Sequence, residues 1–374
     1  MILRIEKLQD ACNKILPAVD TSGELISETL QLEADNSRIL TISVTNKEYF
    51  VKVGIELDEE CSFFATVKAN LFLKLISQTT SETVELNVDD NNLEVVGNGK
   101  YRLPLIDNDG EILRLQEIKI NNVTNEFAID SAILNSMLTY NSKNVAKEGT
   151  GRPAQMMYYV DNNGCITYTK GACVNNFRLP QPVKMLLPVK LVKLFKLFKA
   201  GDVNFKIGYD QLSDTVTQTK VAFETENVSI TSIISCDDGL LSSVPADAIR
   251  GRASKVYPYA ITLNKDDMMQ LINRLSLFAT GELAKSRPYG KFEFNEDSVT
   301  VYDLDMRNNE QVFYETGELE LNYPVSLYLD LADFKATIEG FSEDSTISLS
   351  FGDGEAVVVT RGNIRNVIPE VRIS

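Results

Sequence analysis

Four lysines in one short segment form the most regular pattern of charged side chains in the sequence. In KLVKLFKLFK (190–199), Lys190, Lys193, Lys196 and Lys199 stand three residues apart, with leucine, valine and phenylalanine between them. In an α-helix, side chains three residues apart differ by roughly 60° in their direction around the helix axis. The four lysines therefore cover about half of the helix surface, and the apolar residues cover the other half. The segment alone leaves three interpretations open: a solvated basic face, a helix on an anionic membrane surface, and a helix facing nucleic-acid phosphates.

Other residue types that commonly do chemistry are scarce. The sequence has no histidine, which removes the commonest general base, the commonest zinc ligand and every Ser-His or Cys-His nucleophile. Its five cysteines are scattered without a CxxC pair, so we expect reduced thiols rather than a zinc site or a disulfide framework. The acidic runs at 58–60 and 237–238 lie in turn-like sequence and are interpreted as solvated loops. We therefore expect no enzyme, no metal and no cofactor; a carboxylate-based enzyme is the weaker rival.

The N-terminal segment carries charged residues inside its apolar pattern, namely Glu6, Lys7, Asp10 and Lys14, which is not typical of a signal peptide. No stretch reaches the roughly 18 apolar residues of a membrane span. We expect a cytoplasmic protein without membrane contact.

One arrangement of elements recurs three times along the chain: a strand, an amphipathic helix, alternating strands, a second helix and closing strands. The first helices are predicted from the spacing of Leu8, Ala11, Cys12 and Ile15, from a cap at Asp130 or Ser131, and from a cap at Asn264. The second helices fall in the segments 63–78, 185–201 and 326–341. The pattern predicts an α+β fold of three repeated domains (1–122, 123–250 and 251–374), each with two helices packed on antiparallel sheets.

The net charge of −16 argues by itself against a nucleic-acid-binding protein. The 37 basic residues are nevertheless concentrated on or beside the predicted helices, which predicts one positive surface on a negative body. The candidates for phosphate contact are Lys7, Lys14, Lys74, Lys143, Lys147, Lys190, Lys193, Lys196, Lys199 and Arg274, with Lys68 and Lys335 on the same helices.

The threefold pattern and four segments resemble the beta subunit of bacterial DNA polymerase III, the dimeric sliding clamp, over essentially the whole chain. The segments are FFATVKANLFLKLISQ (63–78), VELNVDDNNLEVVGNGKYRLPL (84–105), TYTKGACV (167–174) and ITLNKDDMMQLINRLSLFA (261–279). The sequence is divergent, and a phage-encoded version would fit. The resemblance implies a head-to-tail homodimer that forms a ring, with helices lining the hole, non-specific contact with double-stranded DNA, and a separate loader. It also makes Arg152 a candidate for phosphate contact.

The resemblance further implies that the DNA polymerase and the clamp loader insert short hydrophobic peptides into a pocket between the second and third domains. The chain departs from the family at Lys170 and Cys173, where an acidic and a basic residue are usual, and in its ending IPEVRIS. The matching pocket positions are Thr169, Gly171, Val174, Pro245, Ile249, Val367, Ile368 and Pro369; the alternative is that the apolar ones are ordinary core residues.

For the joint between the two copies, the resemblance implies Leu103 and Leu105 in the first domain and Leu277 and Phe278 in the third. Burial of these four side chains within their own domains is the alternative. The function implied is that of a processivity factor that tethers the replicative polymerase to DNA. The rival from another class is a clamp-fold scaffold for protein interaction that does not encircle DNA.

Overall fold

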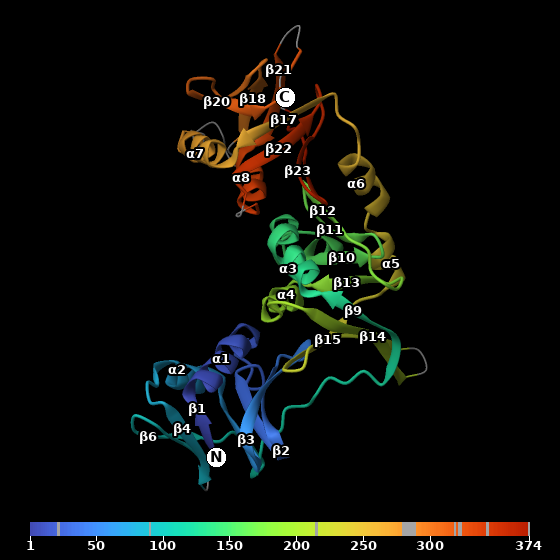
Figure 1. Cartoon of the computed structure of the whole chain (residues 1–374). Coiled ribbons are helices and arrows are strands. Elements are labelled where there is room, and N and C mark those ends of the chain that lie inside the picture. The colour runs from blue at the N-terminus through green and yellow to red at the C-terminus, as the bar shows by residue number, and fades with distance from the viewer. Residues whose placement is uncertain are drawn as a thin grey trace. The chain divides into compact units, whose positions relative to one another are not determined.

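The computed structural model describes residues 1–20, 23–89, 91–213, 216–278, 289–317, 319–320, 324–341 and 344–372 of the 374-residue chain. They form two compact units, each considered by itself (Figure 1). The N-terminal unit comprises Met1–Asn135 and Lys190–Ser235, and the C-terminal unit comprises Ser136–Val189 and Cys236–Ser374. The division passes through the expected second domain, so the three-domain organisation stays a prediction.

The N-terminal unit contains two antiparallel sheets and the helices that pack on them. Its sheets have the strand orders β1-β4-β5-β6 and β2-β3-β16-β15-β14-β9, beside the small pair β7-β8. The helices are α1 (Ile5–Ile15), η1 (Leu16–Ala18), α2 (Ala69–Gln78), α4 (Val189–Lys193) and η4 (Leu194–Leu197), and α3 (Ser131–Tyr140) crosses the unit boundary. The strands are β1 (Ile2–Arg4), β2 (Thr29–Thr45), β3 (Tyr49–Lys68), β4 (Thr83–Asp89), β5 (Asn92–Val96), β6 (Lys100–Pro104), β7 (Asp107–Asn108), β8 (Glu111–Ile112), β9 (Asn122–Asp130), β14 (Asp202–Ser213), β15 (Val216–Glu224) and β16 (Val228–Ile234).

The C-terminal unit is built around one long sheet with the order β13-β10-β11-β12-β24-β23-β22-β17-β20-β19-β18-β21. Its helices are η2 (Asn141–Asn144), η3 (Pro153–Met156), α5 (Asp238–Ser242), α6 (Ala246–Ala253), α7 (Lys265–Ser276) and α8 (Leu331–Glu339). Its strands are β10 (Met157–Asp161), β11 (Gly164–Tyr168), β12 (Ala172–Asn176), β13 (Lys184–Pro188), β17 (Tyr259–Asn264), β18 (Tyr289–Phe294), β19 (Ser298–Asp303), β20 (Asn309–Thr316), β21 (Val325–Asp330), β22 (Thr346–Phe351), β23 (Val357–Arg361) and β24 (Ile364–Ile368).

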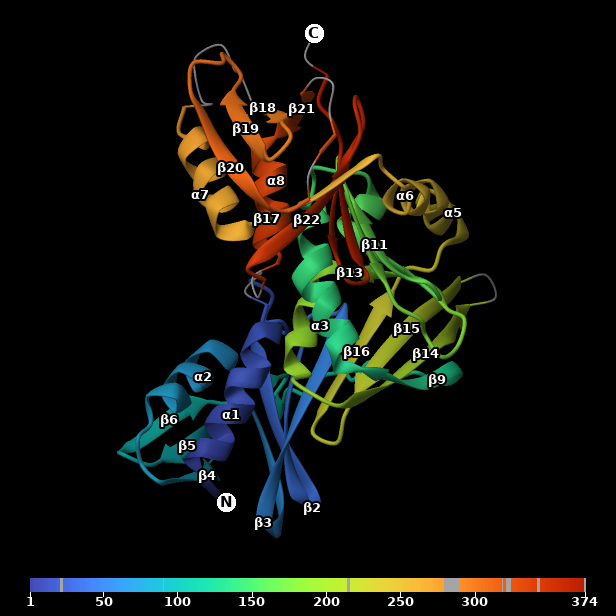
Figure 2. The same ribbon diagram turned by 45° about the horizontal axis from the view of Figure 1, so that its top comes forward.

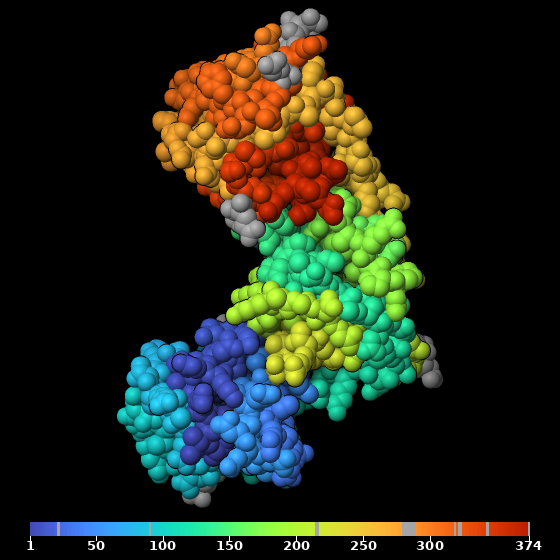
Figure 3. Space-filling model, viewed as in Figure 1, coloured from blue at the N-terminus to red at the C-terminus, as the bar shows by residue number. Residues whose placement is uncertain are grey.

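The helices lie in pairs, and each pair buries its apolar stripe against strands. α1 packs beside α2, and α7 packs beside α8 (Figures 1 and 2). Leu8 and Ile15 of α1 are fully buried, as are Met268 and Leu271 of α7, which matches the predicted apolar faces. Figure 3 shows the atoms of α1 (dark blue) packed directly against those of its neighbouring strands (blue). The α+β class with antiparallel sheets is confirmed.

Side-chain caps begin the helices where the sequence predicts them. The Asn264 side chain accepts a hydrogen bond from the Asp267 backbone N–H at 3.1 Å, at the start of α7. The Asp130 carboxylate accepts one from the Ala132 N–H at 2.8 Å, at the start of α3. These local signals position the helices that carry the candidate basic residues.

Two strand pairings join segments that are far apart in the sequence. In the N-terminal unit β16 pairs with β3, with Ile230 opposite Val51. In the C-terminal unit β24 pairs with β12, with Val367 opposite Ala172. In both cases the last strand of an expected domain (β16 or β24) pairs with a strand of the preceding expected domain (β3 or β12). We call these pairings the first joint (β3–β16) and the second joint (β12–β24).

Candidate nucleic-acid interface

The segment with the four lysines forms a helix that ends earlier than the predicted amphipathic helix. Residues 184–188 form β13, the short strand expected before this helix, and the helical part runs from Val189 to Leu197 as a short α-helix followed by a 3-10 turn. Pro188 fits this boundary, because proline lacks an N–H and disfavours the helical conformation in the residue before it. The helix expected within 185–201 therefore lies there, but Phe198 and Lys199 lie beyond its end.

The lysine row (Lys190, Lys193, Lys196 and Lys199) is exposed, whereas the residues between its members are buried. Phe195 and Leu191 are 0% exposed, and the Phe195 ring packs against Phe223 in a tilted arrangement with ring centroids 4.7 Å apart. In a 3-10 turn three residues complete one revolution, so Lys193 and Lys196 lie nearly in line. The lysines consequently form a narrower ridge than the half-helix that a regular α-helix predicts.

The ridge is only partly neutralised by the acidic residues around it. Lys190 lies 3.5 Å from Asp20 and 3.9 Å from Glu48. Within the described residues, Lys193, Lys196 and Lys199 form no ion pair. Three adjacent free ammonium groups are an electrostatic site for a polyanion.

Lysines of α1 continue this basic surface within the N-terminal unit. Lys14 and Lys199 line the same shallow depression, and Lys7 and Lys14 line the next one. Lys7 donates to the Glu56 carbonyl at 3.1 Å, and Lys14 is 2.5 Å from Asp10 in an i, i+4 pair. The Lys14 side chain is half-buried in this pair and Asp10 is exposed, and a pair at the surface contributes little to stability. Lys74 is exposed on α2.

The basic candidates of the C-terminal unit differ in how strongly they are paired. Lys143 lies 3.9 Å from Glu339 at the end of α8. The Arg274 guanidinium grips the Glu310 carboxylate with two hydrogen bonds, one of them 2.9 Å long, and this contact lowers the pKa of Glu310. Lys147 and Arg152 are exposed in the segment before η3. Arg274 is the least available of the candidates, because its donors already bind a carboxylate.

The predicted pocket residues lie on the second joint, although not all on one face. Val174, Ile249 and Val367 belong to one apolar cluster and are 2%, 9% and 7% exposed. A Cβ on Gly171 would lie 2.7 Å from the Val367 carbonyl oxygen, so glycine lets this turn approach β24. Ile368 points to the opposite side of β24, into the core under α7 and α8.

The remaining pocket positions lie at the edges of this cluster. Thr169 and Gly171 close the turn between β11 and β12, where the Thr169 N–H donates to the Gly171 carbonyl at 2.9 Å. Pro245 is exposed immediately before α6, and Pro369 is half-buried after β24. The sequence therefore locates a real cluster at the second joint, but it misses the two short helices α5 and α6 that cover it. Asp237 as a cap, and the spacing of Ala246, Ile249 and Ala253, are the signals that predict them.

The four residues predicted for the joint between copies divide into two pairs. Leu277 and Phe278 end α7 and are 74% and 58% exposed, which is unusual for large apolar side chains. Leu103 is only 4% exposed in β6, and Leu105 is half-buried. The exposed pair is a ready apolar contact, whereas Leu103 mainly supports its own sheet.

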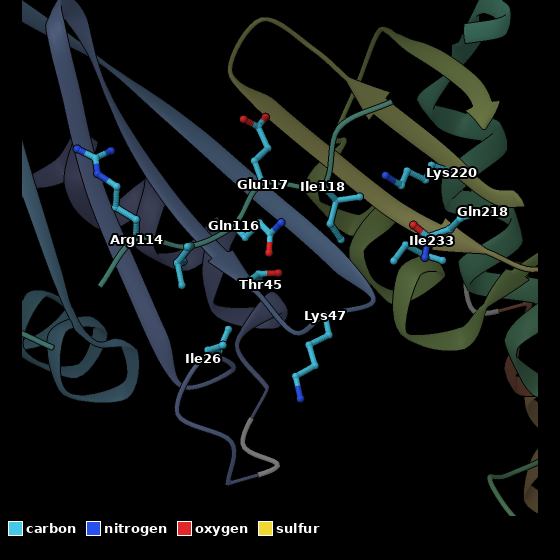
Figure 4. Close-up of a pocket in the computed structure, with 11 residues that line it drawn as sticks. Ile26, Thr45, Lys47, Arg114, Gln116, Glu117, Ile118, Gln218, Lys220 and Ile233 are labelled. Carbon is cyan, nitrogen blue, oxygen red and sulfur yellow. The ribbon is translucent and has the colours of Figure 1, made fainter. Parts of the chain in front are cut away.

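A cavity of about 420 Å³ lies beside the segment that leads from β8 to β9 in the N-terminal unit (Figure 4). Gln116, Glu117 and Ile118 of this segment pass between Thr45 on one side and Gln218 on the other. Its cations are already engaged: Lys47 with Glu24, Arg114 with Glu33, and Lys220 with Asp210. The cavity therefore offers structural ion pairs rather than reactive groups.

Three of the five cysteine thiols, those of Cys12, Cys165 and Cys173, are buried. Burial raises the pKa of the Cys165 and Cys173 thiols well above the ordinary value, so both remain protonated. The acidic residues at 58–60 are exposed, but they belong to β3 rather than to a turn, and Asp237 and Asp238 begin α5. In the part of the chain that the structure describes, no three His, Cys, Asp or Glu side chains gather into a possible metal site.

Solved structures share this arrangement over the full chain. DNA polymerase III subunit beta from Pseudomonas aeruginosa aligns over 100% of both chains with a TM-score of 0.80 at 11% identity. The DNA polymerase sliding clamp from Bacillus subtilis aligns over 100% of this chain and 99% of its own, with a TM-score of 0.77 at 16% identity. The chain has the sliding-clamp fold.

A third solved structure shares the fold. The beta sliding clamp of C. crescentus, with 14% identity, a TM-score of 0.77 and coverage of 100% and 98%, was solved with PEG bound to a putative beta-motif tethering region. No protein-family model matches the sequence, and no curated protein matches it. The similarity is thus one of fold. No described helix is long and apolar enough to cross a membrane.

Proposed function

We propose that the chain is a DNA sliding clamp, a processivity factor that encircles duplex DNA as a head-to-tail homodimer and catalyses no reaction. The observation that carries the proposal is the full-length match to clamp structures together with an exposed lysine row on a protein of net charge −16. A uniformly acidic scaffold has no need of such a segregated ridge. The other side chains proposed to face DNA are Lys7, Lys14, Lys74, Lys143, Lys147, Arg152 and Arg274.

The contact with DNA is proposed to be electrostatic and independent of sequence. Lysine ammonium groups on flexible stems bind phosphates as point charges and read no base edges. The partly neutralised ridge keeps each contact weak, which permits the ring to slide while its topology prevents dissociation. Specific, tight contacts would oppose that movement.

The two joints within the chain suggest how the ring closes. Each joint pairs the last strand of one expected domain with a strand of the domain before it. By the same rule β6, the last long strand of the first expected domain, pairs with β20 of a second copy. The outer side of β6 has no strand partner among the described residues, and β20 meets β17 only near Tyr314 and Thr316. Such a heterologous contact closes into a ring when two copies satisfy both ends.

Exposed apolar side chains lie near both of these strands. Tyr101 on β6 is 44% exposed, and Phe313 on β20 is 62% exposed. Leu277 and Phe278 add apolar surface directly after α7, and α7 itself packs against β20. Their burial between copies supplies the hydrophobic centre that a stable interface requires.

The second joint is proposed as the surface for short hydrophobic peptides of the polymerase and the clamp loader. Val174 and Val367 of its apolar cluster form the peptide surface in this proposal, and Ile249 of α6 packs against them at a position that the family resemblance implies for the pocket. Since partners bind through peptides, the clamp serves several replication proteins from one surface.

Retention on DNA of different topology tests the proposal directly. The protein is diluted until copies separate, mixed with nicked plasmid, and reconcentrated, so that rings close on DNA without a loading enzyme. Gel filtration at physiological salt should then show clamp on the circular plasmid and its release after a single restriction cut. Equal retention on linear and circular DNA would refute encirclement, and absence from both would favour the protein-only scaffold.

Charge reversal in the lysine row gives a second prediction. The double variant Lys193→Glu, Lys196→Glu should lower the slope of log binding constant against log salt by about 2, since each lost phosphate contact removes roughly 0.9. Lys119→Glu, an exposed lysine away from the helices, is the matched control and should leave the slope unchanged. Fluorescence anisotropy with labelled duplexes of two unrelated sequences measures both effects. An unchanged slope in the double variant would remove the lysine row from the DNA interface.

A further inference from the structure

The helix α6 covers the apolar surface of the second joint. It contacts both β12 and β24, and its Ile249 and Ala253 lie in one cluster with Val174 and Val367. Ala253 is 4% exposed, so little of this surface is open to a peptide. Figures 1 and 2 both show α6 alongside α5, at one end of these strands.

Few interactions hold α6 in this position. It is eight residues long, begins at Pro245 without a side-chain cap, and contains Gly251. A helix of this length has almost no stability of its own, and an internal glycine lowers it further. Its apolar anchors are the buried Ile249 and Ala253, four residues apart on one face, and the half-buried Ala246, while Asp247 and Arg252 on the rest of the helix are exposed.

One ion pair completes the attachment. Both terminal nitrogens of Arg250 donate to the Asp161 carboxylate of β10, at 2.8 Å and 2.7 Å. The two side chains are 20% and 15% exposed, which makes the pair stronger than a surface salt bridge. The buried Nε of Arg250 has no hydrogen-bond partner among the described residues, so the closed position also carries an unfavourable contribution.

We propose that α6 is a gate over the peptide surface of the second joint: it occupies the apolar cluster in the free protein, and a partner's hydrophobic peptide displaces it. The inference rests on the proposed function of this surface. In this account Arg250 and Asp161 are the latch. A peptide with large apolar side chains takes the place of Ile249 against Val174 and Val367 after the latch opens.

The gate reduces the apparent affinity of every peptide in proportion to the fraction of molecules in which α6 is open, because only those molecules bind. It thereby sets a threshold, since only peptides that bury more apolar surface than Ile249 and Ala253 remain bound. Any change that loosens α6 without touching β12 or β24 must strengthen peptide binding. If α6 were instead a fixed wall of the site, the same change would weaken binding.

The test compares four proteins with a panel of fluorescein-labelled synthetic hexapeptides in which two positions are leucine, isoleucine, methionine or phenylalanine and the others are alanine, serine or glutamine. Arg250→Ala removes the latch and should bind the best peptide roughly tenfold or more tightly than the unaltered protein. The double variant Asp161→Arg, Arg250→Asp restores an ion pair in reverse and should return towards the original affinity. Arg252→Ala, an exposed arginine of the same helix, is the control and should not change it.

Ala248→Gly provides a second route to an open gate if Arg250→Ala fails to fold. Ala248 is exposed, so the substitution weakens the helix without altering the covered surface, and it should tighten binding about threefold to fivefold. Hydrogen exchange should show faster exchange in α6 of both loosened variants and unchanged exchange in β12 and β24.

The outcomes separate the gate from the function on which it rests. Weaker or equal binding by Arg250→Ala and Ala248→Gly, with binding to the unaltered protein present, would overturn the gate and leave the peptide surface intact. Absence of binding to every variant would overturn both the gate and the peptide surface, while retention on circular DNA would still report independently on the ring.

Discussion

The two joints solve the same structural problem in different ways. At the first joint, an extended segment runs from β8 to β9 and polar contacts fix it: the Gln31 side chain accepts from the Leu115 N–H, and Asp210 accepts from the Asn121 N–H. Lys220 donates to the Lys119 carbonyl at 2.9 Å and pairs with Asp210. At the second joint, a short helix covers the surface with three small or medium-sized apolar residues (Ala246, Ile249 and Ala253) and one ion pair.

The difference indicates that the segment at the first joint is a rigid connection, whereas α6 at the second joint is a cover that can detach. Extended backbone exposes its N–H and C=O groups, and each one that is satisfied by a fixed side chain resists movement of the whole segment. A helix satisfies its own backbone, so it leaves the surface as a unit once its few side-chain contacts break. The first joint is therefore expected to open only with global unfolding, and the second to open locally.

The largest effect is expected from breaking the buried ion pair of the first joint. Lys220→Ala leaves the Asp210 carboxylate, whose side chain is 10% exposed, without its main partner. Loss of one partner from such a pair should reduce the free energy of unfolding by about 3 kcal/mol. Urea denaturation measures it, with Lys52→Ala as the control, because Lys52 of β3 pairs with Glu117 of the same connecting segment. Lys52 and Glu117 are both 35% exposed, so that substitution should cost under about 1 kcal/mol. Equal losses in the two variants would contradict the special role of the buried pair.

Truncating one isoleucine at each joint sharpens the comparison. Ile230 of β16 is 0% exposed and Ile249 of α6 is 9% exposed. Ile230→Ala should cost about 3 kcal/mol because a cavity remains in a rigid sheet. Ile249→Ala should cost about 1 kcal/mol because α6 detaches instead of enclosing a void. Urea denaturation and hydrogen exchange together distinguish the two cases, and a loss at Ile249 as large as at Ile230 would show that α6 is a fixed part of the core.

The joint between copies should behave like neither internal joint. Phe278→Ala removes an exposed side chain, so the unfolding free energy of the single chain should change by less than about 0.5 kcal/mol. Self-association should weaken by about 2 kcal/mol, the range of a central interface residue. Sedimentation equilibrium measures the dimer constant. Val256→Ala, at a residue that is 91% exposed and lies after α6, is the control expected to leave association unchanged.

The smallest expected effect is a dependence on pH at the first joint. Hydrogen bonds from Lys220 and the Asn121 backbone hold the pKa of Asp210 below its ordinary value. A carboxyl whose pKa is lowered by folding stabilises the protein above its unfolded pKa of about 4 and loses that contribution as the pH falls through the folded value. The stability difference between the unaltered protein and Lys220→Ala should therefore shrink between about pH 5 and about pH 3. A difference that grows over this interval would contradict the assignment.

Local signals in the sequence predict the helices that carry the basic residues and fail at the cover of the second joint. Apolar spacing and caps determine α1, α3 and α7, since these depend on neighbouring residues. The helix with the lysine row begins as expected after a short strand, which pairs with β10, but it ends before Lys199 because the backbone becomes extended at Phe198. α6 depends on Asp161, 89 residues away in the sequence. Contacts of that range leave little local trace.

The side chains of the candidate sites follow the same rule. Exposure of the lysine row follows from amphipathic spacing and was predictable. That Ile368 faces the other core, and that Glu310 occupies Arg274, depends on strand register and on tertiary contacts. The sequence thus identifies which residue types gather on a helix face, while the sheet decides which of them remain available.

Electron microscopy of the purified protein tests the central claim most directly. At concentrations that favour association, the account predicts closed rings of two copies with a central hole wide enough for a DNA duplex, and their loss in Phe278→Ala. Solid particles, open filaments or single crescents at every concentration would contradict a self-closing ring and leave the protein-only scaffold as the better description.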